Sequence, residues 1–101
     1  MKFETSVLNS SSFYGLNVEK LTLKECEAKD VDFRESNLKE ADFSYSDLTD
    51  AVFFNTDLSN ANFSHAQQFN IDIKNNILNG AKFSRYEAVR LLGGLGIELV
   101  D

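Results

Sequence analysis

Residues 41–65 read ADFSY SDLTD AVFFN TDLSN ANFSH, five blocks of five residues with a large apolar residue at the third place of each block. The same register extends from Phe3 to Phe83, and 15 of its 17 third places hold Phe, Leu, Ile or Val. Chance would put only about five of the apolar residues of residues 1–85 on these places. A repeat this strict is typical of a stacked architecture, in which each unit contacts its neighbours. The sequence therefore predicts a solenoid.

The other places of the block are also selective. The first place holds a small or apolar residue, such as Cys26 or Ala41, and the second place prefers Asp or Asn. A period of five matches neither the α-helix nor a simple strand, but it suits a chain that turns a corner every five residues. Asp and Asn beside a corner can bond nearby backbone groups and tolerate turn dihedrals. Because no insertion or deletion interrupts the count, we expect Gln68 on an inward third place and Phe54 and Phe69 outside.

Blocks such as Ala41-Asp42-Phe43-Ser44-Tyr45 and Ala61-Asn62-Phe63-Ser64-His65 resemble the pentapeptide-repeat family over about residues 1–85. The resemblance implies an all-β fold, a right-handed quadrilateral β-helix with four blocks per coil and about four coils. Stacked aromatic side chains bury large areas and pack specifically against the rings above and below them. With twenty residues per coil, the phenylalanines at third places form two core ladders: Phe13, Phe33 and Phe53, and Phe43, Phe63 and Phe83.

The register stops at Phe83, which predicts a β-helix over residues 1–83 and a C-terminal cap over residues 84–101. Ser84-Arg85-Tyr86-Glu87 matches a capping box, with Ser84 as the N-cap. Ala88, Leu91, Leu92 and Leu95 follow at helical spacing, so a short capping α-helix with one apolar stripe is expected. We expect Gly93-Gly94 to end this helix and residues 96–100 to form a short terminal strand.

The N-terminus has no comparable cap, because Phe3 already lies on the register. The end of a solenoid exposes apolar core and backbone groups. Three interpretations stay open: the first coil frays, another chain covers it, or the sequence is a piece of a longer protein.

Composition limits the function classes. The chain of 101 residues has 10 Lys and Arg against 16 Asp and Glu, a net charge of −6, which disfavours direct binding to nucleic acid. One cysteine cannot form an intramolecular disulfide, and we find neither a signal peptide nor an apolar run long enough for a membrane. A cytoplasmic location without membrane association is expected.

Catalytic residues are not apparent in the sequence. His65 is the only histidine and falls on an outward place, where a solvated residue is expected, and Cys26 falls on an inward place, where it acts as a small hydrophobe. One His and one Cys do not make a zinc site without further ligands. The glycines of residues 93–96 follow a helix, so phosphate binding is not expected. The sequence predicts no enzyme, no cofactor, no metal and no small-molecule substrate.

Charge is unevenly distributed along the chain. The segment from Glu40 to Ile73 contains six acidic residues and neither Lys nor Arg. Two interpretations are open: the acids serve corner formation and solubility, or they form an acidic surface for a basic partner. The outward aromatics Phe54 and Phe69 are either ordinary exposed residues or contacts with the terminal segment or a second subunit.

The last 33 residues resemble quinolone-resistance (Qnr-type) pentapeptide proteins in Phe69-Asn70-Ile71-Asp72-Ile73, Gly80-Ala81-Lys82-Phe83 and Tyr86-Glu87-Ala88, and in Leu91-Leu92 and Leu95-Gly96-Ile97. The resemblance implies a rod-like homodimer that imitates DNA and binds DNA gyrase or topoisomerase IV, protecting the enzyme from quinolones or inhibiting it. By position, the acidic partner-binding surface would comprise Asp42, Asp47, Asp50, Asp57 and Asp72. The cap and dimer contact would comprise Tyr86, Val89, Leu91, Leu92, Leu95, Ile97 and Leu99. The alternative is a general interaction or structural module without a topoisomerase link, part of a longer chain.

Overall fold

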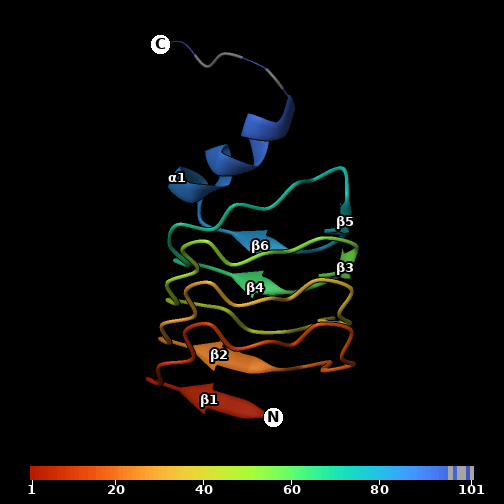
Figure 1. Cartoon of the computed structure of the whole chain (residues 1–101). Coiled ribbons are helices and arrows are strands. Elements are labelled where there is room, and N and C mark those ends of the chain that lie inside the picture. The colour runs from red at the N-terminus through yellow and green to blue at the C-terminus, as the bar shows by residue number, and fades with distance from the viewer. Residues whose placement is uncertain (96, 98–99, 101) are drawn as a thin grey trace.

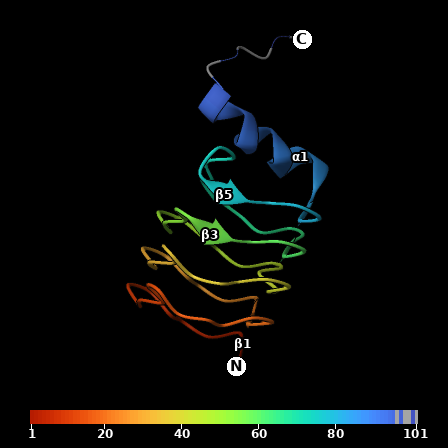
Figure 2. The same ribbon diagram turned by 90° about the vertical axis from the view of Figure 1, so that its right-hand side faces the viewer.

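The chain winds into a stack of four-sided coils with a helical segment over its C-terminal end, as a computed structural model shows (Figures 1 and 2). The structure describes residues 1–95, 97 and 100, except for the side chains of residues 93–95. The molecule measures 41 × 24 × 23 Å, and its long axis follows the stacking direction.

Neighbouring coils pair in parallel at a spacing of twenty residues. The strands pair as β1 (Lys2–Glu4) with β2 (Thr22–Lys24), β3 (Thr56–Asp57) with β5 (Asn76–Ile77), and β4 (Asn62–Phe63) with β6 (Lys82–Phe83). Single bridges, from Val7–Glu27 to Asp47–Gln67, continue the same spacing between these strands. One turn of the stack therefore takes four blocks of five residues.

Each corner depends on the fifth place of the block. From Thr5 to His65, every fifth-place residue has a positive φ between 50° and 69°. Only Gly15 among these is a glycine, although a left-handed backbone costs other residues roughly 1–2 kcal/mol each. The hydrogen bonds between coils and the buried core offset this cost, because every corner is fixed by the coils beside it.

Two phenylalanine columns fill the interior. Phe13, Phe33 and Phe53 stack with ring centroids 5.4 and 4.9 Å apart. Phe43, Phe63 and Phe83 stack at 4.9 Å in both steps. The two columns also touch edge to face across the interior, at centroid distances of 5.4 to 6.0 Å. The predicted ladders thus form one continuous aromatic core.

Buried hydroxyl groups at first places bind the backbone of the preceding coil. The Ser36 hydroxyl donates to the carbonyl oxygen of Phe13 at 2.5 Å, and the Thr56 hydroxyl donates to that of Phe33 at 2.8 Å. The Ser46 hydroxyl donates in the same way to the carbonyl of Leu23. No buried side-chain N or O atom lacks a partner within the described part of the chain. These residues therefore supply hydrogen bonds that Ala, at the equivalent places of other blocks, cannot supply.

The uninterrupted register is wrong at one block. Gln68 is exposed with a φ of 59°, whereas Phe69 is completely buried, 5.3 Å from the Phe83 ring and 6.1 Å from the Phe63 ring. The inward place has slipped by one residue, because a buried amide would need partners while a buried phenyl ring gains contacts. Phe54 lies outside as expected, with 43% of its surface exposed.

The C-terminal cap begins where expected but continues differently. Helix α1 (Arg85–Ala88) has Ser84 as its N-cap, but the Ser84 hydroxyl accepts the His65 backbone N–H at 3.3 Å and caps nothing. A 3₁₀-helix, η1 (Val89–Leu95), follows, so Gly93-Gly94 do not end the helical segment. Glycine disfavours the α-helix by about 1 kcal/mol relative to Ala, and the tighter 3₁₀ turns are common at helix ends. Of the expected terminal strand, residues 96, 98 and 99 lie outside the described residues, and residues 97 and 100 belong to no strand.

Candidate acidic binding surface

The stack has four faces, which we name after the third-place residue of the first block on each. The Phe3 face contains residues 1–5, 21–25, 41–45 and 61–65, and the Leu8 face contains residues 6–10, 26–30 and 46–50. The Phe13 face contains residues 11–15, 31–35 and 51–55, and the Val18 face contains residues 16–20, 36–40 and 56–60.

The structure separates most of the predicted acidic residues. Asp42 lies on the Phe3 face and Asp57 on the Val18 face, whereas Asp47 and Asp50 share the Leu8 face. Asp72 lies in the slipped segment beyond the Phe13 face, where no bridge joins residues 72 and 52 among the described residues. The stretch that is acidic in sequence is therefore not one surface: Asp47 and Asp50 share a face, and Asp50 lines a surface hollow together with Asp72.

Second-place acids have a structural role at the corners. Each carboxylate accepts the backbone N–H two residues further on, at 2.8 to 3.1 Å; the acceptors are Asp42, Asp47, Asp57 and Asp72. The arrangement is an Asx-type turn, which explains the preference for Asp and Asn at this place. Asp50 differs, because it occupies a fifth place with a φ of 58° and is exposed.

Hydrogen bonds lower the pKa of two of these carboxyl groups, those of Asp47 and Asp57. The Thr49 hydroxyl, at 2.6 Å, and the Thr49 backbone N–H hold the pKa of Asp47 below its usual value. At Asp57, partial burial acts to raise the pKa. Hydrogen bonds from Ser59 and the nearby charge of Lys39 outweigh burial, so the pKa of Asp57 is also lowered. Both residues are therefore negative well below neutral pH.

Lysines of the preceding coil offset part of this charge. Lys39 lies 3.7 Å from the Asp57 carboxylate, and Lys29 lies 3.4 Å from Glu27 and 3.8 Å from Asp47. The acidic stretch has neither Lys nor Arg in sequence, but the coil brings lysine side chains to it from eighteen residues earlier. Surface pairs of this kind contribute little to stability, yet they reduce the local charge.

Two further acids complete the Leu8 face. Glu27 pairs directly with Asp47 in a β-bridge, and the Asp30 backbone N–H bonds the carbonyl oxygen of Thr49, which places Asp30 beside Asp50. The face thus has four acids against one base, Lys29, a net −3 of the −6 of the whole chain. Sequence analysis missed Glu27 and Asp30 because they lie in a segment of mixed charge. Comparison of residues twenty apart would have found them.

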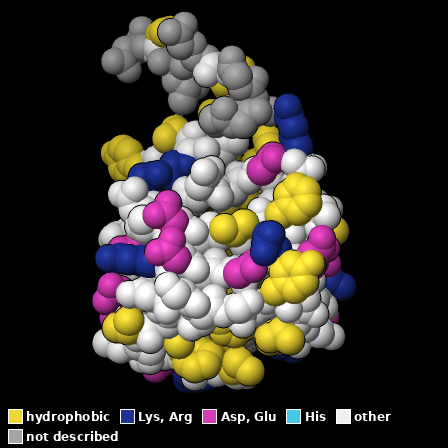
Figure 3. All heavy atoms as spheres, in the orientation of Figure 1, with side chains coloured by type: hydrophobic (Ala, Val, Ile, Leu, Met, Phe, Trp, Pro, Cys, Tyr) yellow, Lys and Arg dark blue, Asp and Glu magenta, His cyan; other side chains and the backbone are white. Residues whose placement is uncertain are grey.

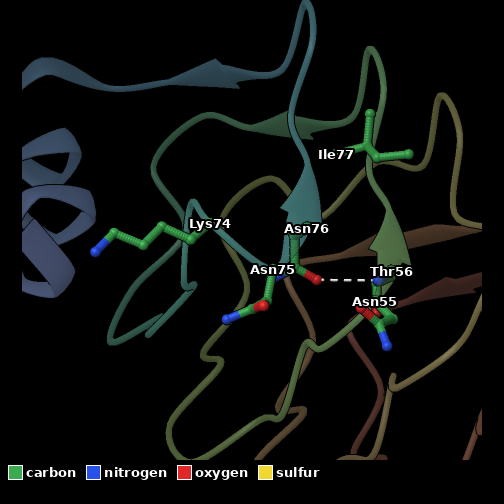
Figure 4. Close-up of a pocket in the computed structure, with 6 residues that line it drawn as sticks. All are labelled: Asn55, Thr56, Lys74, Asn75, Asn76 and Ile77. Carbon is green, nitrogen blue, oxygen red and sulfur yellow. Dashed lines mark hydrogen bonds between the residues drawn. The ribbon is translucent and has the colours of Figure 1, made fainter.

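One surface hollow is lined mainly by amide side chains. Its volume is about 340 Å³, and it lies where the slipped segment rejoins the stack, lined by Asn55, Thr56, Lys74, Asn75, Asn76 and Ile77 (Figure 4). The Asn76 side-chain oxygen accepts the Thr56 backbone N–H at 3.0 Å, and the Lys74 side chain points away from the other residues. The lining contains amides and one cation but no pairing of a nucleophile with a base.

Two other kinds of site are missing from the described residues. These residues contain no cluster of three or more His, Cys, Asp or Glu side chains that could hold a metal ion. They also include no helix with the length and apolar character needed to cross a bilayer.

The predicted cap residues divide into two groups. Leu91 packs against the core, and Leu92 is half-buried. Tyr86, Val89 and Ile97 are exposed, with 93%, 50% and 51% of their surfaces accessible. The Leu95 side chain and Leu99 lie outside the described residues.

Comparison with known proteins identifies the repeat. Residues 22–53 and 32–67 match the pentapeptide repeats, with eight copies. No curated protein matches the chain by sequence.

Solved structures share the fold. Two trypsin-treated variants of QnrB1, a plasmid-mediated fluoroquinolone resistance protein, superpose with TM-scores of 0.77 and 0.75 at 20% identity. They cover 95% and 93% of this chain, which spans only 46% and 45% of theirs. HetL, a pentapeptide-repeat protein involved in heterocyst differentiation regulation in the cyanobacterium Nostoc sp. strain PCC 7120, has a TM-score of 0.68 at 22% identity. That match covers 74% of this chain and 35% of HetL.

At sequence identities of 20% and 22%, the similarity to the QnrB1 and HetL structures establishes the architecture of the chain, which is a right-handed β-helix. Together with the match of residues 22–67, it shows that the chain contains pentapeptide repeats and has the fold of pentapeptide-repeat proteins.

Proposed function

We propose that the chain is a non-enzymatic, rod-like binding protein of Qnr type, which presents an acidic face to the DNA-binding region of DNA gyrase or topoisomerase IV. The observation that carries the proposal is the Leu8 face, with Glu27, Asp30, Asp47 and Asp50 on two adjacent coils. The likeness in fold to a fluoroquinolone resistance protein supports the choice of target.

The charge density of the Leu8 face is closer to that of DNA than the charge density of the whole rod is. A net charge of −6 along 41 Å is roughly one charge per 7 Å, far below the one per about 1.7 Å of duplex DNA. Two coils at a strand spacing of about 4.8 Å extend roughly 10 Å, so a net −3 on the Leu8 face is about one charge per 3 Å. A single DNA strand has one charge per about 3.4 Å. The Leu8 face therefore approximates one phosphate strand.

The fold also holds these charges in place before binding. The carboxylate of Asp47 is fixed by two hydrogen bonds from Thr49, and the backbones of Asp30 and Asp50 are fixed at corners. A partner would lose little free energy in ordering them, since their positions depend on a stacked core. Electrostatic binding of this type weakens with salt.

We also propose that two copies join through the C-terminal segment. The exposed side chains of Tyr86, Val89 and Ile97 support this contact, because apolar and aromatic residues are typical of interface centres. Replacing Ile97 by Asp should shift the mass measured by light scattering from about twice 11.4 kDa towards 11.4 kDa. An unchanged mass would contradict this contact.

The direct test of the target is a supercoiling assay with purified gyrase and topoisomerase IV, with and without a quinolone. We expect inhibition of supercoiling, or recovery of activity in the presence of the drug, at micromolar concentrations of the chain. The effect should decrease when the salt concentration is raised from 50 to 200 mM. No effect at tens of micromolar protein at low salt would contradict the proposal.

A second candidate is an interaction module without a topoisomerase link. It is favoured by apolar side chains exposed on the Phe13 face, where Tyr14, Val52 and Phe54 have 55%, 45% and 43% of their surfaces accessible. The Arg34 guanidinium lies 5.3 Å from the Tyr14 ring centre on this face. Aromatic residues and Arg are enriched at protein interfaces. Inactivity in the gyrase assay would favour this candidate.

A further inference from the structure

One wall of the stack is interrupted beside the slipped segment. On the Phe13 face, backbone hydrogen bonds join neighbouring coils: the Phe33 N–H donates to the carbonyl oxygen of Val52, and the Val52 N–H donates to that of Val31, both at 2.9 Å. Between β4 and β5 the chain rises away from the coil beneath it (Figure 1). The Phe13 face is therefore paired below residues 51–53 and open above them.

The opening leaves two backbone groups without the partners that a regular repeat would supply. At a spacing of twenty residues, the Asp72 N–H would donate to the Ala51 carbonyl oxygen, and the Phe53 N–H would donate to the Asp72 carbonyl oxygen. Neither bond forms, and the Asp72 carbonyl oxygen instead accepts the Asn76 side-chain amide at 2.9 Å. Within the described part of the chain, the Ala51 carbonyl oxygen and the Phe53 N–H form no hydrogen bond. Residues 51–53 are therefore a strand edge with one free acceptor and one free donor.

A surface hollow lies at this edge. Its volume is about 310 Å³, at the lower end of the range for ligand pockets, and it is lined by Asp50, Ala51, Val52, Phe53, Asn70 and Asp72. Val52 is 45% exposed, so an apolar side chain lies beside the open backbone groups. In Figure 3, which has the orientation of Figure 1, acidic and hydrophobic side chains lie close together on the wall of the stack. The hollow thus combines room, apolar surface and free backbone groups.

Two carboxylates flank the hollow. The Lys74 backbone N–H, at 2.8 Å, and the Asn75 side chain lower the pKa of Asp72, so this residue is negative at neutral pH. Asp50 is exposed at the corner between the Leu8 face and the Phe13 face. Neither carboxylate belongs to an ion pair among the described residues. Their charge is therefore available to a basic group that enters the hollow.

These features select an extended, basic peptide as the ligand. Unpaired strand edges bind other strands, because backbone hydrogen bonds supply affinity for an extended chain. The free acceptor and the free donor belong to the residues on either side of Val52. In a parallel bridge, one partner residue uses its N–H and its carbonyl group to bond two such positions. The two carboxylates disfavour an anionic ligand and favour a cationic one.

We propose that the gap in the Phe13 face is a docking site for an extended segment of a partner protein that contains Lys or Arg. The segment adds a parallel strand above residues 51–53. One of its residues takes the place that a regular repeat would give to Asp72, donating its N–H to the Ala51 carbonyl oxygen and accepting the Phe53 N–H. Its basic side chains lie against Asp50 and Asp72. This binding mode is separate from the acidic Leu8 face and does not depend on gyrase binding.

Hydrogen exchange of the full chain, followed by NMR at single amides, tests whether the edge is open. The Phe53 N–H should exchange about a hundredfold faster than the Phe33 N–H, which occupies the same place one coil below and is hydrogen-bonded. Comparable protection of the two amides in the free chain would overturn the proposal, because the edge would then be closed.

The binding probe is a fluorescent pentapeptide of alternating lysine and valine, and its fluorescence anisotropy is the readout. Two matched peptides are controls: in one, glutamate replaces lysine, and in the other, methyl groups on the backbone nitrogen atoms remove the N–H donors. We expect the basic peptide to bind, the methylated peptide to bind about fivefold more weakly, and the acidic peptide not to bind at the same concentrations. Equal binding of all three peptides would contradict the proposal.

A double variant of the chain, Asp50→Asn with Asp72→Asn, tests the two carboxylates. It should bind the basic peptide about tenfold more weakly than the wild type does. The control is Glu25→Gln with Glu40→Gln, which removes two charges from the Phe3 and Val18 faces and should leave the affinity unchanged. Asn keeps a side-chain acceptor for the turn at position 72, and circular dichroism melts verify that both variants fold.

The site of binding is located by repeating the exchange measurement with saturating basic peptide. The peptide should slow the exchange of the Phe53 N–H and leave that of the Phe33 N–H unchanged. Equal affinities of the two double variants, or binding that leaves the exchange of Phe53 unchanged, would overturn the proposal, and so would the absence of binding at millimolar peptide. None of these measurements includes gyrase, so their outcome is independent of the proposed function.

Discussion

Replacing Phe69 by Ala tests the register slip, because the uninterrupted count of five places this residue outside. The side chain is completely buried, and its ring lies 5.3 Å from Phe83 and 6.1 Å from Phe63. Truncation of a buried Phe costs about 3–5 kcal/mol, through lost transfer free energy and a residual cavity. The total stability of a domain is only about 5–15 kcal/mol, so this loss is a large part of it.

The assay is urea unfolding followed by circular dichroism, with Phe54→Ala as the matched control. At an m-value of about 2 kcal/mol/M, the Phe69 variant should lose about 2 M in its urea midpoint. Phe54 is 43% exposed, so the control should lose less than about 1 kcal/mol. Equal losses for the two variants, or a larger loss for Phe54→Ala, would refute the slip.

Two further predictions concern hydrogen bonds in the walls. Ser46→Ala removes the buried donor to the Leu23 carbonyl and should cost about 1–3 kcal/mol in urea unfolding, whereas Ser59→Ala at a half-buried place should cost less than 1 kcal/mol. Because the folded pKa values of Asp47 and Asp57 lie below the unfolded value of about 3.9, their stabilising effect is complete above about pH 5 and is lost as the pH falls through the folded values. Thermal melts should therefore decline below about pH 4, less steeply in Asp47→Asn and Asp57→Asn; an equal decline in these variants would contradict the assignment.

The sequence pattern was sufficient for the features that repeat at every block. The phenylalanines at third places identified the core ladders, since a residue such as Phe43 recurs in the same environment every twenty residues. The second-place preference for Asp also had a local explanation, which the bond from the Ser44 N–H to Asp42 bears out. Both features depend on short-range geometry that each block repeats.

Features that depend on a single block or on the stack were not predictable in the same way. Around Gln68 the sequence offers both Phe69 and Ile73 as core residues, and only packing against Phe83 decides between registers. The small size expected at first places does not predict that the Ser46 hydroxyl bonds the preceding coil. The order of acidic residues along the chain does not show which of them share a face. The Leu8 face brings together acidic residues that are twenty positions apart in the sequence.

The account's central claim is that stacking concentrates charge on the Leu8 face and that this face binds the partner. The most direct measurement compares the gyrase affinity of Asp30→Asn with Asp50→Asn against that of Glu25→Gln with Glu40→Gln. Each double variant removes two charges from fifth-place corners with φ of 55° to 58°, but only the first pair lies on the Leu8 face. At about 0.7 kcal/mol for each charge, the first variant should bind about tenfold more weakly than the wild type, and the second should change less than about twofold. Equal losses in the two variants would contradict the claim.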